Sequence, residues 1–403
     1  MSQINMSQVK TTQSLLFSRG MNAVLVAQFL SALADNALLF AAIALLKSQH
    51  APDWQIPLLQ EFFVIAFIFL APFVGPFADA FSKGRVMLVA NGLKFIGAAT
   101  MLLGLHPLLA YNLVGIGAAA YSPAKYGILG ELVSADKLIK ANSLIEGSTI
   151  VAILLGAVLG GMLADYSVIA ALGTIAACYL LAAASNLFIP RLAAAHPITH
   201  FSPIELVKDF TKALRTLFNN SDARFTLIGT SVFWGAGSTL RFLLVAWVPV
   251  ALLITDNSTA ANLSGAVAIG IALGAVAAAR FVSLRCINRA LPAGVLIGAL
   301  IMAFAFIDNL YFAIAMLILI GICGGFYVVP LNALLQERGH TSVGTGHAIA
   351  VQNFFENFCM LLMVGFYTLL TKNGASAINS TVGVGALVLS AISLLAWSRL
   401  RRV

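Results

Sequence analysis

Two side chains of opposite charge stand alone in long apolar stretches of this sequence. Asp35 is the only charged residue between positions 21 and 46, and Arg241 is the only one between positions 225 and 254. Each stretch exceeds the roughly 20 residues that a helix needs to cross a bilayer. Because a charge at that depth is costly to insert, it usually serves in binding, ion coupling or pairing. The two positions lie 206 residues apart in a chain of 403 residues.

The residue types around these two charges suit a ligand that carries both a phosphate and an ammonium group. Arginine donates two parallel hydrogen bonds to a phosphate, lysine offers a compact ammonium group, and carboxylates accept from an ammonium group. We therefore expect one polar cavity that collects these side chains. The expected substrate-binding residues are Asp35, Asn36, Tyr121, Lys125, Arg241, Gln352 and Glu356. Of these, Gln352 and Glu356 share a helical face at a spacing of four.

A second group of polar residues is expected beside this cavity and consists of Glu146, Lys94 and Asn353. We expect Glu146 to form a structural ion pair with Lys125 or Lys94 in preference to contacting substrate. For Lys94 the alternative is that its ammonium group extends toward the membrane surface. Three interpretations stay open for Asp35 and Arg241: headgroup binding, a static ion pair that locks two parts of the protein, and proton or ion coupling.

The composition places these charges in an integral membrane protein. Hydrophobic residues make up 60% of the chain and charged residues 9%, whereas soluble domains carry about 25% charged residues. Apolar runs of helical length recur, while the strands of a barrel would alternate over about 10 residues. The sequence thus predicts an all-α protein whose twelve spans lie near 21–46, 57–79, 85–105, 108–130, 138–163, 167–189, 225–254, 262–283, 291–307, 309–334, 346–370 and 378–398.

The two halves of the chain repeat each other at the same offset of 206 residues. Gly115-Ile116 recurs as Gly321-Ile322, and Tyr121 recurs as Tyr327. A parallel repeat of six spans is typical of major facilitator transporters, whose substrate sites lie near the midplane between the halves. The sequence therefore predicts a twelve-helix major facilitator fold with two pseudo-symmetric six-helix bundles. Their expected ranges are 1–190 and 225–403, joined by a cytoplasmic central loop at 191–224.

The central loop contains the signals of an amphipathic helix. Ser202-Pro203-Ile204-Glu205 combines a capping serine, a proline at the first helical position and a glutamate that closes a capping box. The apolar face that follows consists of Val207, Phe210, Leu214, Leu217 and Phe218. We expect this face either to lie on the membrane surface or to pack against the cytoplasmic side of the protein.

Positive charges are distributed asymmetrically over the predicted loops. Eighteen of the 23 Lys and Arg residues fall on one side of the predicted membrane, which predicts that both termini are cytoplasmic. The net charge of +8 follows from this topology and anionic lipid, without a nucleic-acid partner. Residues 1–12 are polar, so no cleavable signal peptide is expected. The four cysteines have no metal-binding or redox spacing, and neither a metal nor a cofactor is expected.

The loop between the second and third spans resembles the Gly-x-x-x-Asp-Arg-x-Gly-Arg motif of the major facilitator superfamily. The corresponding residues, expected to form a conformational latch, are Gly75, Asp79, Lys83, Gly84 and Arg85. Ala80 stands where the motif has its first arginine, and the Gly-Arg pair comes two positions late. In that superfamily the cluster helps to hold the halves together in the outward-facing state. A tight turn with basic residues that set the topology is the alternative.

Longer segments resemble the bacterial lysophospholipid transporters of that superfamily. The most specific are Tyr-Ser-Pro-Ala-Lys-Tyr-Gly at 121–127 and Pro-Leu-Asn-Ala-Leu-Leu-Gln-Glu-Arg at 330–338. The resemblance implies a flippase of the bacterial inner membrane that moves lysophospholipids, such as the ethanolamine and glycerol forms, from the outer to the cytoplasmic leaflet. A cytoplasmic acyltransferase/acyl-carrier-protein synthetase would then re-acylate them. We expect the transporter itself to be a monomer.

Other classes of function have less support. None of the six histidines is followed five positions later by Asp, and no Gly-x-Ser-x-Gly occurs, which argues against a membrane-embedded lipid enzyme. The sequence also lacks a Gly-Lys-Ser/Thr loop, so ATP hydrolysis is not expected. The leading alternative is a transporter of the same fold for a soluble zwitterionic or drug-like metabolite.

Overall fold

The computed structural model describes residues 17–133, 138–190, 202–343 and 345–401. Within these ranges the chain forms thirteen α-helices, two short 3-10 helices and no strands. The first six are α1 (Arg19–Ser48), α2 (Leu58–Ala80), α3 (Lys83–Leu102), α4 (Pro107–Leu132), α5 (Leu138–Tyr166) and α6 (Val168–Asn186). After α7 (Pro203–Asn219) come α8 (Ser221–Ala251), α9 (Asn257–Phe281), α10 (Leu291–Phe304), α11 (Leu310–Ser342), α12 (Thr345–Lys372) and α13 (Ala377–Leu400). The 3-10 helices are η2 (Asp53–Gln55) and η4 (Leu284–Ala290).

The all-helical prediction is confirmed, because each of the twelve predicted spans coincides with one of these helices other than α7. The largest difference lies in α11, which continues to Ser342, beyond the predicted end at position 334. Eleven helices in the described ranges are long and apolar enough to cross a membrane. The remaining predicted span is α4, which carries Asn112, Tyr121 and Lys125.

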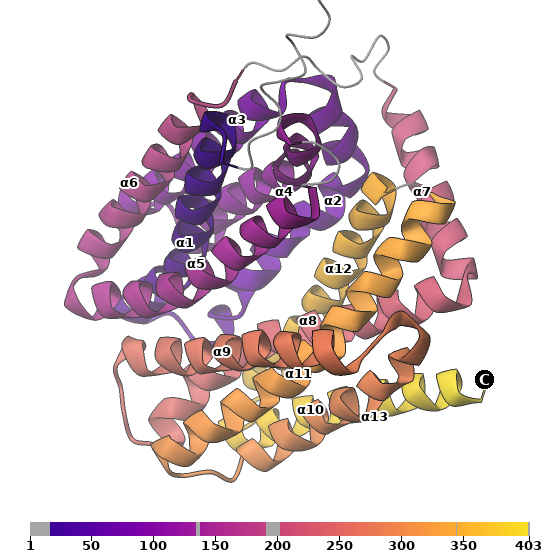
Figure 1. Ribbon diagram of the computed structural model, residues 1–403. Coiled ribbons are helices and arrows are strands. Elements are labelled where there is room, and N and C mark those ends of the chain that lie inside the picture. The colour runs from indigo at the N-terminus through magenta and orange to yellow at the C-terminus, as the bar shows by residue number, and fades with distance from the viewer. Residues whose placement is uncertain (1–16, 134–137, 191–201, 344, 402–403) are drawn as a thin grey trace, which may run out of the picture.

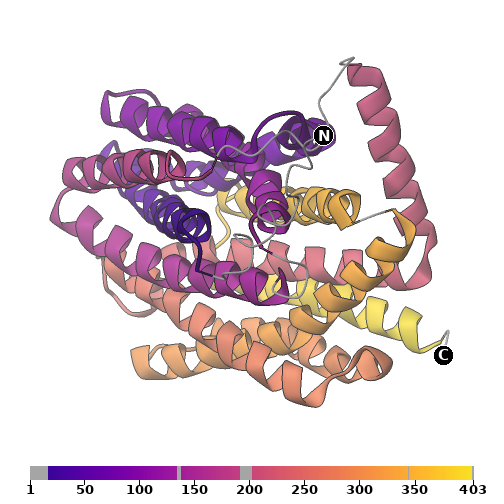
Figure 2. The same ribbon diagram turned by 45° about the horizontal axis from the view of Figure 1, so that its top comes forward.

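The helices form two sets that face each other, α1–α6 and α8–α13, as Figures 1 and 2 show. The two sets meet along two helix pairs, α2 with α12 and α5 with α9. Small residues let helices approach closely within and between the sets. A Cβ atom added to Gly270 of α9 would lie only 2.8 Å from the Cα atom of Gly321 of α11. This tight packing makes each set a firm support for the polar side chains that it carries.

The helix predicted in the central loop is α7, and it runs along one edge of the bundle (Figure 1). The Ser202 hydroxyl caps it by accepting a hydrogen bond from the Glu205 N–H at 3.5 Å. Phe210 and Leu217 are buried, and the Phe210 ring packs edge-on against Phe354 of α12, with ring centroids 5.6 Å apart. Phe210 and Leu217 therefore pack against protein, which was one of the two expected arrangements, whereas Val207 stays exposed.

The two helix sets are joined at the end of the bundle opposite α7. At the end of α5, the Asp165 carboxylate accepts hydrogen bonds from the N–H groups of Asn257 and Ser258 at 2.8 and 2.9 Å. These N–H groups belong to the start of α9, where backbone donors have no partner within the helix. On the opposite flank, the Thr368 hydroxyl of α12 donates to Glu61 Oε1 of α2 at 2.8 Å. This end of the bundle is therefore closed by hydrogen bonds between the sets.

Candidate functional site

The ion-paired partner of Asp35 is Lys94. Lys94 Nζ of α3 lies 2.7 Å from Asp35 Oδ2 of α1, and the side chain of Lys94 is only 2% exposed. The second carboxylate oxygen, Oδ1, accepts a hydrogen bond from the Tyr179 hydroxyl of α6 at 2.8 Å. Lys94 thus points into the first helix set, and its ammonium group does not reach the membrane surface. Asp35 and Arg241 do not pair in this structure.

Polar and aromatic groups complete the surroundings of the Lys94 ammonium group. Nζ donates to the Ser31 hydroxyl at 3.0 Å, and this hydroxyl in turn donates to Asn91 Oδ1 at 2.8 Å. The ring centroids of Tyr121 and Tyr179 lie 5.1 and 5.9 Å from Nζ, within the range of cation–π attraction. Four helices therefore contribute to a single network around one buried ion pair.

Arg241 occupies a different environment in α8. Its side chain is half-buried, and among the described residues it makes no hydrogen bond or ion pair. The buried Tyr111 of α4 lies within electrostatic reach of both Asp35 and Arg241. A half-buried guanidinium group without an acidic partner is a ready site for an anion, since arginine matches the geometry of phosphate.

Glu356 of α12 is buried and bonded to uncharged groups. Gln352 Nε2 lies 2.8 Å from Glu356 Oε1 and 2.9 Å from Asn332 Oδ1 of α11. The Thr230 hydroxyl of α8 also lies against the carboxylate. The expected pairing of Gln352 with Glu356 on one helical face is therefore present, and amide groups hold the carboxylate in place.

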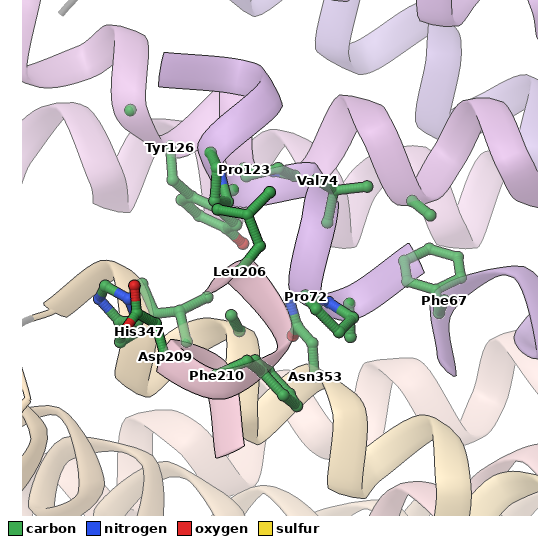
Figure 3. A pocket seen from close by; sticks show the side chains of 17 residues that line it. Phe67, Pro72, Val74, Pro123, Tyr126, Leu206, Asp209, Phe210, His347 and Asn353 are labelled. Atoms are coloured by element: carbon green, nitrogen blue, oxygen red, sulfur yellow. The ribbon is translucent and has the colours of Figure 1, made fainter. Parts of the chain in front are cut away.

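A cavity of about 550 Å³ opens between the two helix sets at the end that carries α7, and Figure 3 shows its lining. Helices α2 and α4 form one side, and α7 and α12 form the other. The apolar lining includes Phe67, Val74, Pro123, Leu206, Phe210 and Ile349. Its polar groups include Asp209, His347 and Asn353. The volume lies within the range of roughly 300–1,000 Å³ that is typical of ligand pockets.

Two of the expected site residues lie next to this cavity. Asn353 lines it directly. Lys125 is buried, and its Nζ lies 4.2 Å from the centroid of the Tyr126 ring, which is itself part of the lining. Polar side chains of α4 and α12 therefore lie at or next to the apolar cavity.

The remaining expected site residues are more dispersed. Asn36 lies at the contact of α1 with α5, and its side chain donates to the Ala32 carbonyl of its own helix at 2.8 Å. Tyr121 is buried beside Lys94. Glu146 lies in α5, and its side chain lies outside the described part of the structure.

The five residues of the expected latch lie at the α7 end. Lys83 Nζ lies 2.6 Å from Glu131 Oε1 within the first helix set. Gly75 lines the cavity, Gly84 packs against Ile189, and Arg85 is exposed. The backbone of Asp79 belongs to α2, whereas its side chain is outside the described part.

Sequence reasoning missed several residues of these networks. Tyr179, Ser31 and Asn91 hold Asp35 and Lys94, and Asn332 holds Gln352. Each is a single polar residue in an apolar span, which resembles many uninvolved positions. The only distinguishing signal was for Asn332, which lies in one of the specific segments that resemble lysophospholipid transporters.

Known proteins provide an independent comparison. The profile of the Major Facilitator Superfamily matches residues 24–364. The "Lysophospholipid transporter LplT" of Shigella boydii serotype 4 is 56% identical over 395 residues, which cover 98% of this chain and all of that protein. The protein of the same name from Escherichia coli strain K12 / DH10B is also 56% identical, with the same coverage.

Solved structures share the fold at low sequence identity. The nucleoside transporter NupG matches with a TM-score of 0.72 and 13% identity, covering 94% of this chain and 98% of that one. A POT family transporter in complex with 5-aminolevulinic acid gives 0.76 and 13%, covering 95% and 97%. A bacterial homologue of the human lysosomal transporter Spinster, inward-facing and unoccupied, gives 0.70 and 16%, covering 94% and 97%.

Proposed function

Because the chain belongs to the major facilitator superfamily, we propose that it is a flippase that moves lysophospholipids across a bacterial inner membrane by alternating access. The superfamily profile covers most of the chain, and the protein is a multi-pass membrane transporter rather than an enzyme. The substrate class is supported by two relatives named lysophospholipid transporters, each 56% identical over nearly the full length of both chains.

The main structural support for this proposal is the environment of the Arg241 side chain. The side chain of Arg241 is half-buried and has no acidic partner among the described residues. A cation in such a place favours an anionic ligand group, and a phosphate can accept two hydrogen bonds from it at once. In this proposal Arg241 binds the phosphate of the headgroup.

Asp35 and Glu356 serve the other end of the headgroup. The side chain of Asp35 keeps 24% of its surface exposed although Lys94 and Tyr179 each hold one of its oxygens. Each carboxylate oxygen can accept a further hydrogen bond, so an ammonium or hydroxyl group of the ligand can bind there. Asn36, Tyr121, Lys125, Gln352 and Asn353 are proposed to complete the binding site.

The apolar cavity at the α7 end of the bundle suits the single acyl chain of a lysophospholipid. Its walls are mostly aliphatic and aromatic, and burying a methylene group in such surroundings yields about 0.8 kcal/mol. A soluble zwitterion would gain nothing from this surface. The presence of both a charged site and an apolar cavity therefore favours an amphiphile over a soluble metabolite.

We further propose that both termini and α7 lie in the cytoplasm. In that orientation the open cavity faces the cytoplasmic leaflet, and the hydrogen-bonded end with Asp165 and Glu61 faces outward. A lysophospholipid taken from the outer leaflet would leave on the inner side, where a cytoplasmic acyltransferase/acyl-carrier-protein synthetase would re-acylate it.

Purified protein in proteoliposomes tests the proposal. We expect inward movement of labelled lysophosphatidylethanolamine without chemical change, and no such movement in liposomes without protein. Glycerophosphoethanolamine, which has the same headgroup and no acyl chain, is the matched control and is expected to move far more slowly. Equal rates for the two compounds would instead favour a transporter of soluble zwitterions, and acyl transfer by the purified chain would contradict a transport function.

A further inference from the structure

Lys94 is a buried cation for which headgroup binding requires no role. It is 1% exposed, and its network reaches Ser31, Asp35, Tyr121 and Tyr179 rather than the cavity surface. Bringing an ammonium group into a membrane span is costly. A lysine at this depth therefore needs a compensating anion, and the acidic group in contact with it is Asp35.

The pairing changes the charge that Asp35 presents to a ligand. The carboxylate is partly exposed, while its compensating cation is buried immediately behind it at 2.7 Å. From the exposed side of Asp35, the pair is a dipole with no net charge. Since Arg241 carries a positive charge without an acidic partner among the described residues, these three groups together are positive by one unit.

A site with this charge tolerates more than one kind of headgroup. A zwitterionic headgroup can place its phosphate at Arg241 and its ammonium group at the free lone pairs of Asp35. An anionic headgroup with neutral hydroxyls can place its phosphate at the same arginine and donate a hydroxyl to the same carboxylate. Without Lys94, Asp35 would carry a full negative charge beside the bound phosphate. Like charges that share one site repel each other, so a headgroup without a compensating ammonium group would then bind less well.

We propose that Lys94 determines headgroup tolerance: by neutralising Asp35, it allows the central site to accept net anionic as well as zwitterionic lysophospholipids. Lys94 acts through Asp35 and is a specificity residue that does not itself contact the ligand. This inference rests on the proposed function, because it requires the headgroup to bind at Asp35 and Arg241.

The test is the ratio of two transport rates in proteoliposomes, one for lysophosphatidylethanolamine and one for lysophosphatidylglycerol. Lys94→Met removes the charge and keeps most of the volume, so the ratio is expected to rise about tenfold in favour of the zwitterion, the change that corresponds to 1.4 kcal/mol. Lys94→Arg keeps the charge and is expected to keep the ratio of the unchanged protein. Lys94→Gln, which keeps a hydrogen-bond donor for Asp35, serves as a second neutral variant if the methionine variant does not fold.

Lys83→Met is the matched control. Lys83 is also a buried lysine in an ion pair within the first helix set, with Glu131 at 2.6 Å, but this pair lies at the α7 end. Loss of the Lys83–Glu131 pair is expected to slow the transport of both substrates by the same factor. Equal slowing of both substrates by Lys94→Met would assign Lys94 a purely structural role and overturn the inference. Absence of transport in the unchanged protein would instead refute the proposed function, so the two failures are distinguishable.

Discussion

The two helix sets differ in how their buried charges are compensated. In the first set, Asp35 and Lys94 neutralise each other, and Tyr179 and Ser31 satisfy the remaining hydrogen bonds. In the second set, Arg241 has no acidic partner among the described residues, and Glu356 is held by uncharged groups. The sequence repeat relates Asp35 to Arg241, yet only Asp35 carries its counter-charge nearby. The two halves thus share a repeated backbone, but the buried charge of Asp35 is compensated within its own half, whereas that of Arg241 is not compensated by any described residue.

Because of this difference, we expect substitutions in the two helix sets to affect different properties of the protein, namely stability in one case and ligand binding in the other. Removing one member of a buried ion pair typically costs about 3–5 kcal/mol, because the other charge is left uncompensated. Removing a charge that has no partner carries no such penalty. Substitutions of Asp35 or Lys94 should therefore lower stability strongly, whereas substitutions of Arg241 should lower transport without lowering stability.

The charge exchange Asp35→Arg with Arg241→Asp is expected to have the largest effect. If the two charges formed a lock between the helix sets, the exchange would restore it. In this structure the new arginine would instead face Lys94, so we expect loss of transport together with a lower unfolding temperature than in either single variant. Transport and thermal unfolding of the three proteins decide the matter, and recovery of activity in the double variant would contradict the assigned partners.

Arg241→Ala is expected to lower lysophospholipid transport about thirtyfold or more, because a charge-assisted contact to a buried anion contributes roughly 2–5 kcal/mol. The unfolding temperature should stay the same or rise slightly, since no ion pair is lost. Arg280→Ala, at an exposed position at the end of α9, is the control and should leave transport unchanged. A marked loss of stability in Arg241→Ala would indicate a structural partner for this arginine.

Asp35→Asn is expected to destabilise the protein by about 3–5 kcal/mol, because Lys94 then remains buried without an anion. Adding Lys94→Met should recover most of this loss, although transport should stay impaired. Denaturation in detergent measures both variants. If Asp35→Asn were as stable as the unchanged protein, the ion pair could not be the main role of the Lys94 ammonium group.

The closed end of the bundle offers the smallest expected effect. Asp165→Ala removes the carboxylate that joins the two sets at the start of α9, and loss of such a cap typically costs about 0.5–2 kcal/mol. Spin labels at the exposed positions Leu103 and Leu253 should then show a larger population with this end open. Asp256→Ala is the matched control, because Asp256 caps the same helix from within its own set through Thr259 N–H. Equal distance distributions for both variants would exclude a latch at Asp165.

Much of the architecture could be predicted because it depends on local properties. The twelve spans followed from apolar runs, and the cap of α7 followed from Ser202 and Glu205. The partners of Asp35 could not be predicted in the same way. Lys94 allowed two interpretations, and Tyr179 gave no signal, because one tyrosine in an apolar helix is compatible with many orientations.

The segments that form helices of membrane-spanning length, and the positions of the isolated charges, follow from neighbouring residues along the chain. The contact of Lys94 with Asp35, 59 positions away, depends on how the helices pack. So does the lack of an acidic partner for Arg241 in the described part of the chain. The physical reason is that these helices are apolar around most of their circumference, so the sequence contains little amphipathic signal to orient them. The rotation and tilt of each helix in the packed bundle therefore decide which buried charges meet.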